Sequence, residues 1–190
     1  MTSAPDVASE LGEVAARTER LQAALKAEIP AFRVIYKDES RLHRAIAAVV
    51  RPLNARYLQD YTTVIFGSVA FPSRAWRAQI GELAIYEVLR HEAVHLRDAR
   101  RFPVLFELSW LLLPLPTLLT ARAYWEWRGY AESMRARVEL GLPVDDAWIE
   151  HVVQRFVGAD YGFMWPFPAM VRRRFVALRA SLVVEGDARL

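Results

Sequence analysis

Three residues in the middle of the chain have the types and the spacing to bind a metal ion and activate water. They are His91, Glu92 and His95, in the pattern H-E-x-x-H. On a helix, residues four apart point from the same face, so the two imidazoles can meet one Zn²⁺ at about 2.0–2.1 Å. Glu92 is rotated by about 100° from His91 around the helix axis, where it can reach a metal-bound water but cannot easily bind the metal. The pattern predicts a zinc site with Glu92 as general base.

The neighbours of the two histidines also favour a metal site. Their helix is otherwise apolar on this stretch, and buried imidazole nitrogens need partners. The alternative is an ordinary helix that carries two histidines in the core or at the surface. Because the chain has no cysteine, any metal ligands must be histidines and carboxylates.

The elements that position this pattern follow from hydrophobic periodicity. The H-E-x-x-H residues lie on a helix that we expect from about Ser73 to Arg101. Before it, Leu53–Ala70 is rich in β-branched and aromatic residues, which predicts strands with Gly67 as a turn or bulge. The other expected elements are a strand over 31–36 and helices over 7–28, 40–50, 120–140, 145–157 and 169–184.

These elements predict an α+β fold, mostly α, with a small sheet ahead of the long helix that carries the histidines. The chain has 190 residues, of which 54% are hydrophobic, so it can bury a core and is not of the disordered class. We expect one domain over residues 1–190, in which residues 1–30 could form an N-terminal helical extension.

Charge and the N-terminal sequence limit the partners and the compartment. The net charge of +3 is too balanced to indicate a nucleic-acid partner. No basic segment followed by an apolar run begins the chain, so no signal peptide is predicted and we expect a cytoplasmic protein. The sequence leaves the oligomeric state open.

One apolar segment, residues 102–120, has about the length of a membrane span. It contains Glu107 and the prolines Pro103, Pro114 and Pro116, which a spanning helix disfavours. We therefore expect a buried or cleft-lining hairpin. The alternative is a segment that inserts into a membrane or rests on its surface, which would make the protein membrane-associated.

With this pattern the sequence resembles the zincin metallopeptidases, whose active-site helix carries H-E-x-x-H and follows a sheet. In that family the edge strand of the sheet binds peptide, and Thr62–Phe71 is similar to that strand. The metzincin branch would need glycine at 98 and histidine at 101, where this chain has Asp98 and Arg101. Residues 60–175 are also similar to small, uncharacterised bacterial proteins grouped with the metallopeptidases.

The resemblance to the gluzincin branch implies a glutamate from a later helix as the third zinc ligand. Glu126 and Glu132 both qualify, and we favour Glu126. In that branch an aspartate four residues after the ligand orients a ligating histidine; here the position is Tyr130, whose phenol can accept a histidine N–H. Asp98 could orient His95 instead, or could be a surface residue paired with Arg97 or Arg101.

The leading hypothesis is therefore a zinc metallopeptidase acting on a peptide or protein substrate. His91, His95 and Glu126 would hold Zn²⁺, and Glu92 would take the proton of the attacking water. Two alternatives stay open. One is a zinc-binding protein of the same fold that lacks activity and serves as a regulatory or interaction module. The other is a membrane-associated helical protein in which residues 102–120 matter most.

Overall fold

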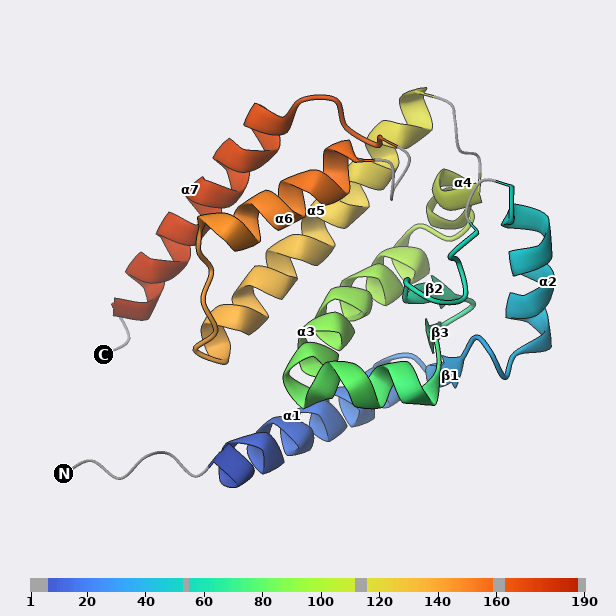
Figure 1. The fold of residues 1–190 in the computed structure, drawn as a ribbon, viewed down its shortest axis with the longest axis horizontal. Helices are drawn as coiled ribbons and strands as arrows, with labels where there is room; N and C mark the ends of the chain where they lie inside the picture. The colour runs from blue at the N-terminus through green and yellow to red at the C-terminus, as the bar shows by residue number, and fades with distance from the viewer. Residues whose placement is uncertain (1–6, 53–54, 112–115, 159–162, 188–190) are drawn as a thin grey trace. The chain divides into compact units, whose positions relative to one another are not determined.

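The computed structural model describes residues 7–52, 55–111, 116–158 and 163–187. Figure 1 shows the helices and strands within these ranges. The chain divides into two compact units, Met1–Leu96 and Arg97–Leu190, at a boundary inside the third helix. The expected α+β class, mostly α-helical with a small sheet, is confirmed. The elements are α1 (Val7–Glu28), β1 (Arg33–Tyr36), α2 (Arg41–Val50), β2 (Thr63–Ile65), β3 (Ser68–Phe71), α3 (Arg74–Arg101), α4 (Leu105–Leu111), α5 (Pro116–Glu139), α6 (Asp146–Val157) and α7 (Pro168–Asp187).

The sheet of the first unit has the strand order β1-β3-β2. β1 runs parallel to β3, and β2 pairs with β3 in the antiparallel sense. Phe66 and Gly67 join β2 to β3 with φ angles of 46° and 75°, the left-handed backbone that a tight two-residue hairpin turn requires. The expected peptide-binding strand over Thr62–Phe71 therefore contains a short edge strand, β2, and the central strand β3.

The strand prediction that began at Leu53 is wrong over its first half. Residues 55–59 form turns, and only β2 and β3 are extended. β-branched and aromatic residues favour a strand only where another strand is available to pair with it. The central strand β3 already pairs with β1 on one side and with β2 on the other. Residues 53–54 lie outside the described part of the chain.

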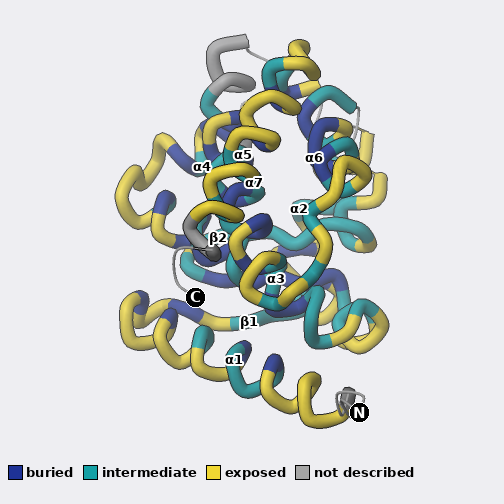
Figure 2. The backbone as a smooth tube through the Cα atoms, turned by 90° about the vertical axis from the view of Figure 1, so that its left-hand side faces the viewer, coloured by how far each residue is buried: buried dark blue, intermediate teal, exposed yellow. Residues whose placement is uncertain are grey.

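The core of the first unit packs α1 and α3 against the sheet. Leu25 of α1 and Ile29, which directly follows that helix, join Val69 and Phe71 of β3 and Leu89 of α3 in one apolar cluster. The buried positions of α1 lie on the side of the helix nearest β1 (Figure 2). The predicted helix over 7–28 is confirmed, and Leu21 and Leu25 of its apolar repeat pack in this cluster, whereas Leu11 is exposed.

The long helix α3 is broken at Gly81, whereas the sequence predicted one continuous helix from Ser73 to Arg101. Gly81 has φ 77° and ψ 167°, a conformation that only glycine adopts readily. The first section begins at Ser73, whose hydroxyl accepts a hydrogen bond of 3.0 Å from the backbone N–H of Trp76. The second section, from Glu82 onward, carries the H-E-x-x-H residues.

The second unit is helical. α5 ends at Glu139. Two residues further, Gly141 has a φ of 66°, which allows two backbone bonds that satisfy the last carbonyls of the helix, Gly141 N–H to Val138 O and Leu142 N–H to Arg137 O. Asp145 caps α6 by accepting a 2.8 Å bond from the Trp148 N–H. The core of this unit is formed by α5, α6, α7 and the segment before α7, and its buried members include Ala123, Met134, Ile149, Phe156 and Phe175.

The apolar segment over 102–120 is described only in part, because residues 112–115 and the side chains of 110–120 lie outside the described part. Its first half contains α4, in which Phe106 and Ser109 are buried. Val104 and Leu105 are 66% and 50% exposed, so of the expected buried or cleft-lining hairpin the buried form is wrong for these positions. A short helix buries one face and leaves the other in water. Among the described helices, none combines the length and hydropathy that crossing a membrane would require.

Candidate metal centre

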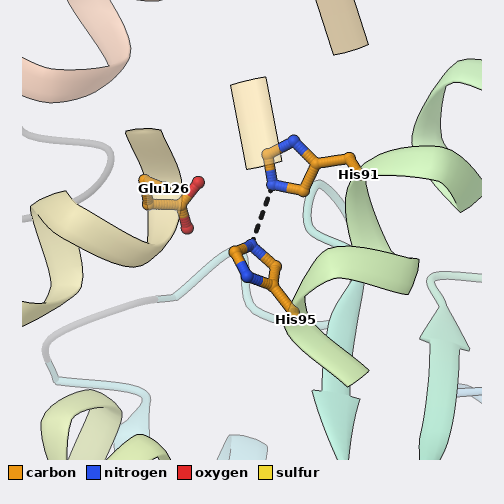
Figure 3. A group of neighbouring side chains, drawn as sticks. All are labelled: His91, His95 and Glu126. Atoms are coloured by element: carbon orange, nitrogen blue, oxygen red, sulfur yellow. Dashed lines mark hydrogen bonds between the residues drawn. The ribbon is translucent and has the colours of Figure 1, made fainter. Parts of the chain in front are cut away.

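The second section of α3 places the two histidines one turn apart on the same face. Their Nε2 atoms lie 2.9 Å apart, and the ring centroids are separated by 4.7 Å with an interplanar angle of 77°. Figure 3 shows the two rings turned toward one another from successive turns of the helix. His95 is buried and His91 is half-buried. The helical spacing therefore produces the convergence that the sequence predicted.

Glu126 of α5 completes a group of three potential ligands. One nitrogen of each histidine and one carboxylate oxygen of Glu126 all lie within 4.8 Å of one another. Glu126 is only 2% exposed, and Figure 3 shows its carboxylate on the side of the histidine rings. A buried carboxylate beside one buried and one half-buried imidazole is an arrangement that a bound cation would stabilise. This group could hold a metal ion.

The separation of the two histidine nitrogens suits one tetrahedral ion. Two nitrogen ligands at 2.0–2.1 Å from a tetrahedral zinc lie about 3.3 Å apart. The observed 2.9 Å is slightly shorter, so a small rotation of either imidazole would admit the ion. With two histidines and one glutamate the set leaves a fourth position for water or substrate, which is the composition of catalytic zinc sites.

Glu92 follows His91 on α3 and is buried. Its charge acts on Lys37, which comes directly after β1. Burial lowers the pKa of Lys37 from its ordinary 10.5 to about 7, and the Glu92 carboxylate opposes this by raising that pKa. The predicted general base therefore shares the interior of the first unit with a basic group.

Lys37 is a residue that the sequence reasoning missed. Its side chain is fully buried, and its ammonium donates hydrogen bonds to the carbonyl oxygens of Tyr57 and Tyr61. The nitrogen also lies 4.0 Å from the centre of the Tyr57 ring. The one available signal was that Lys37 is one of only two lysines in an arginine-rich chain, the other being Lys26.

His43 forms part of the same interior group, which agrees with a structural role for this histidine. Its Nδ1 lies 2.7 Å from the Tyr57 hydroxyl, and the side chain is fully buried. Burial, helped by the charge of Lys37, lowers the pKa of His43 to about 4, so the imidazole is neutral at physiological pH. The remaining histidine, His151, is exposed on α6.

Asp98 is buried, so the expectation of a surface aspartate paired with Arg97 or Arg101 is wrong. Its two carboxylate oxygens accept bonds of 3.0 Å each from the Nε and Nη2 atoms of Arg128 on α5. Burial raises the pKa of Asp98, and the guanidinium of Arg128 counteracts that shift. This two-pronged bond fixes the last turns of α3 to α5, within one turn of His95 and two residues of Glu126.

Two further predicted site residues, Tyr130 and Glu132, also lie on α5. Tyr130 packs its ring against Phe156 of α6, with centroids 5.9 Å apart. Glu132, the alternative third ligand, accepts a 3.3 Å bond from Arg135 one turn further along α5. The group of potential ligands found in the described part of the chain contains Glu126 and does not contain Glu132.

Comparison with known proteins gives no relative for this chain. No family model matches it, no curated protein matches it in sequence, and no solved structure matches it.

Proposed function

We propose that this chain is a zinc-dependent peptidase with Glu92 as its general base. The observation that carries the proposal is the convergence of His91, His95 and Glu126 within 4.8 Å, beside a buried acid at position 92. Zincin-like metallopeptidases, which the sequence resembles, use this combination of residue types. Two imidazoles and one carboxylate with a fourth position left open form a ligand set used by catalytic zinc sites.

In the proposed reaction the chain supplies ligands, a base and a fixed geometry. His91, His95 and Glu126 would hold the ion, which supplies a Lewis acid for the scissile carbonyl. Glu92 would accept a proton from the attacking water and then donate that proton to the leaving amine. Asp98 and Arg128 hold α3 against α5 and so keep the ligands in position.

The test is a comparison of two glutamine variants on a mixed peptide library. Glu92→Gln removes the base at constant size, so kcat/KM should fall by roughly 10²–10⁴-fold while the zinc content is unchanged. Glu132→Gln is the matched control, because this glutamate pairs with Arg135, and it should keep wild-type activity. Equal cleavage by wild type and Glu92→Gln would exclude this glutamate as the base.

The same experiment distinguishes the non-catalytic alternative. A zinc-binding regulatory or interaction protein would hold about one zinc per chain and cleave no peptide in any variant. Bound zinc with no turnover in wild type would therefore replace the peptidase proposal by this one.

The exposed apolar side chains near α4 favour a second proposal, contact with a membrane surface. Phe102, Val104, Leu105 and Leu108 are all exposed to solvent. Burial of such a group in the headgroup region would favour binding. The protein should float with phospholipid vesicles, and Leu105→Glu with Leu108→Glu should abolish flotation. Recovery of the wild type only in the bottom fraction would contradict this contact.

A further inference from the structure

The second unit contains a pocket that the proposed peptidase chemistry does not use. Its volume is about 210 Å³. The lining comes from α5, α6, α7 and the segment before α7, and it is mostly apolar. The lining includes the side chains of Tyr124, Trp127, Phe156, Trp165 and Arg174.

Half of the lining residues are aromatic, and the rings of Trp127 and Phe156 pack against a further ring that does not line the pocket. Phe175 is fully buried, and its ring centroid lies 4.3 Å from that of Trp127 and 6.2 Å from that of Phe156. On another side, the ring of Trp165 packs edge-on against Phe167 at 5.7 Å. Rings supported in this way present a preformed surface, which suits a flat aromatic group more than a flexible chain.

Arg174 gives the pocket a single cationic group. Its guanidinium carbon lies 5.4 Å from the centre of the Trp127 ring. The neighbouring Arg172 binds the carboxylate of Glu150, whereas Arg174 has no acidic partner among the described residues. An exposed guanidinium on an aromatic wall can form a two-pronged bond with a carboxylate.

We propose that this pocket binds an aromatic ring that carries a carboxylate on a short chain. The ring would lie among Tyr124, Trp127, Phe156 and Trp165, and the carboxylate would bind Arg174. The volume is adequate for the ring and the start of its chain, because a cavity of about 150 Å³ can hold benzene. The carboxylate would lie beyond this volume, at the exposed guanidinium of Arg174. Such a group occurs in free aryl carboxylates and at the carboxyl end of a peptide that ends in phenylalanine. This proposal is independent of the metal centre.

The test is an NMR titration of the full-length chain with 3-phenylpropionate. The chain has six tryptophans, hence six indole N–H signals, and those of Trp127 and Trp165 should shift until they saturate. The neutral analogue 3-phenylpropanamide should bind roughly tenfold more weakly, because it lacks the charge that Arg174 recognises. Shifts of these two signals that do not saturate, or no shifts at all, would overturn the proposal.

Two matched variants test the role of the arginine. Arg174→Gln should weaken 3-phenylpropionate binding roughly tenfold and abolish the preference over the amide. Arg173→Gln changes a neighbouring exposed arginine that does not line the pocket, so it should bind like the wild type. Both positions are exposed, so circular dichroism should show an unchanged fold. Equal binding by the two variants would also overturn the proposal.

A second pair of probes identifies the source of the carboxylate. The peptides acetyl-Gly-Gly-Phe and its C-terminal amide contain the same ring with and without the terminal charge. If the free acid shifts the same two indole signals and the amide does not, the pocket binds the carboxyl end of a peptide chain. If only 3-phenylpropionate shifts these two signals, the pocket binds a free aryl carboxylate.

Discussion

The Nε2 atoms of His91 and His95 lie 2.9 Å apart across one turn of α3. Two imidazole nitrogens at this distance either share a proton in a hydrogen bond or bind the same metal ion. The buried carboxylate of Glu126 within reach of both favours the cation, because a positive ion would stabilise all three groups together.

Zinc should therefore stabilise the folded chain. At a free zinc concentration about one hundred times the Kd, the free energy of unfolding should rise by about 2.7 kcal/mol. Thermal unfolding with and without zinc measures the effect. His91→Ala should abolish it, and His151→Ala, which changes an exposed histidine on α6, should retain it. The same zinc-dependent increase in His91→Ala would mean that the ion binds elsewhere.

Lys37 should make stability depend on pH above neutrality. Its pKa is about 7 in the folded chain and 10.5 when unfolded, so between these values the unfolded state binds more protons. The free energy of unfolding contributed by this group should consequently rise as the pH increases from about 7 to about 10. Denaturant unfolding at several pH values measures it, and Lys37→Met should remove this part of the slope.

The pKa of Lys37 can also be measured directly, because the chain has only two lysines and Lys37→Met assigns its signal. ¹³C-labelled lysine should show the Lys37 signal titrating near pH 7. In Glu92→Gln the value should fall further, since the Glu92 carboxylate raises it. A Lys37 signal that titrates near 10.5 would show that the side chain is not buried as described.

A side chain at position 81 should destabilise the chain through its backbone conformation, although there is space for the added atoms. A Cβ built at Gly81 meets no atom within 4 Å, so the cost of Gly81→Ala comes from the backbone alone, about 1–3 kcal/mol. Gly12→Ala is the matched control: it also meets no atom, but it lies inside α1 and should stabilise the chain by about 0.5–1 kcal/mol. Chemical unfolding compares the two. Equal effects would mean that α3 runs straight through position 81.

The Asp98–Arg128 pair should contribute far more stability than the exposed pair of Glu132 and Arg135, which lies on the same helix as Arg128. A double-mutant cycle with Asp98→Asn and Arg128→Met should give a coupling of roughly 1.5–3 kcal/mol, because the carboxylate is buried. The corresponding cycle for Glu132 and Arg135 should give about 0.5 kcal/mol or less. Similar coupling energies for the two pairs would contradict the burial of Asp98.

The sequence predicted those features that depend on local geometry. His91 and His95 face each other because they are four residues apart on one helix. The helix expected over 120–140 agrees with α5 at its C-terminal end, Glu139. The preference for Glu126 over Glu132 came from a family resemblance, and Glu126 is the acid found beside the histidines.

Features set by distant contacts could not be predicted. Asp98 is thirty residues from Arg128, and no periodicity connects the two. The burial of Lys37 depends on carbonyl groups of a turn about twenty residues away. The break at Gly81 lies within an apolar pattern typical of a continuous helix, so only the backbone angles reveal it.

The central claim is that His91, His95 and Glu126 together bind zinc. X-ray diffraction from zinc-grown crystals, recorded on both sides of the zinc absorption edge, tests it most directly. The account predicts one strong anomalous peak, within about 2.0–2.2 Å of both Nε2 atoms and of a Glu126 carboxylate oxygen. A zinc peak bounded by other residues, or no peak beside the two histidines, would contradict it.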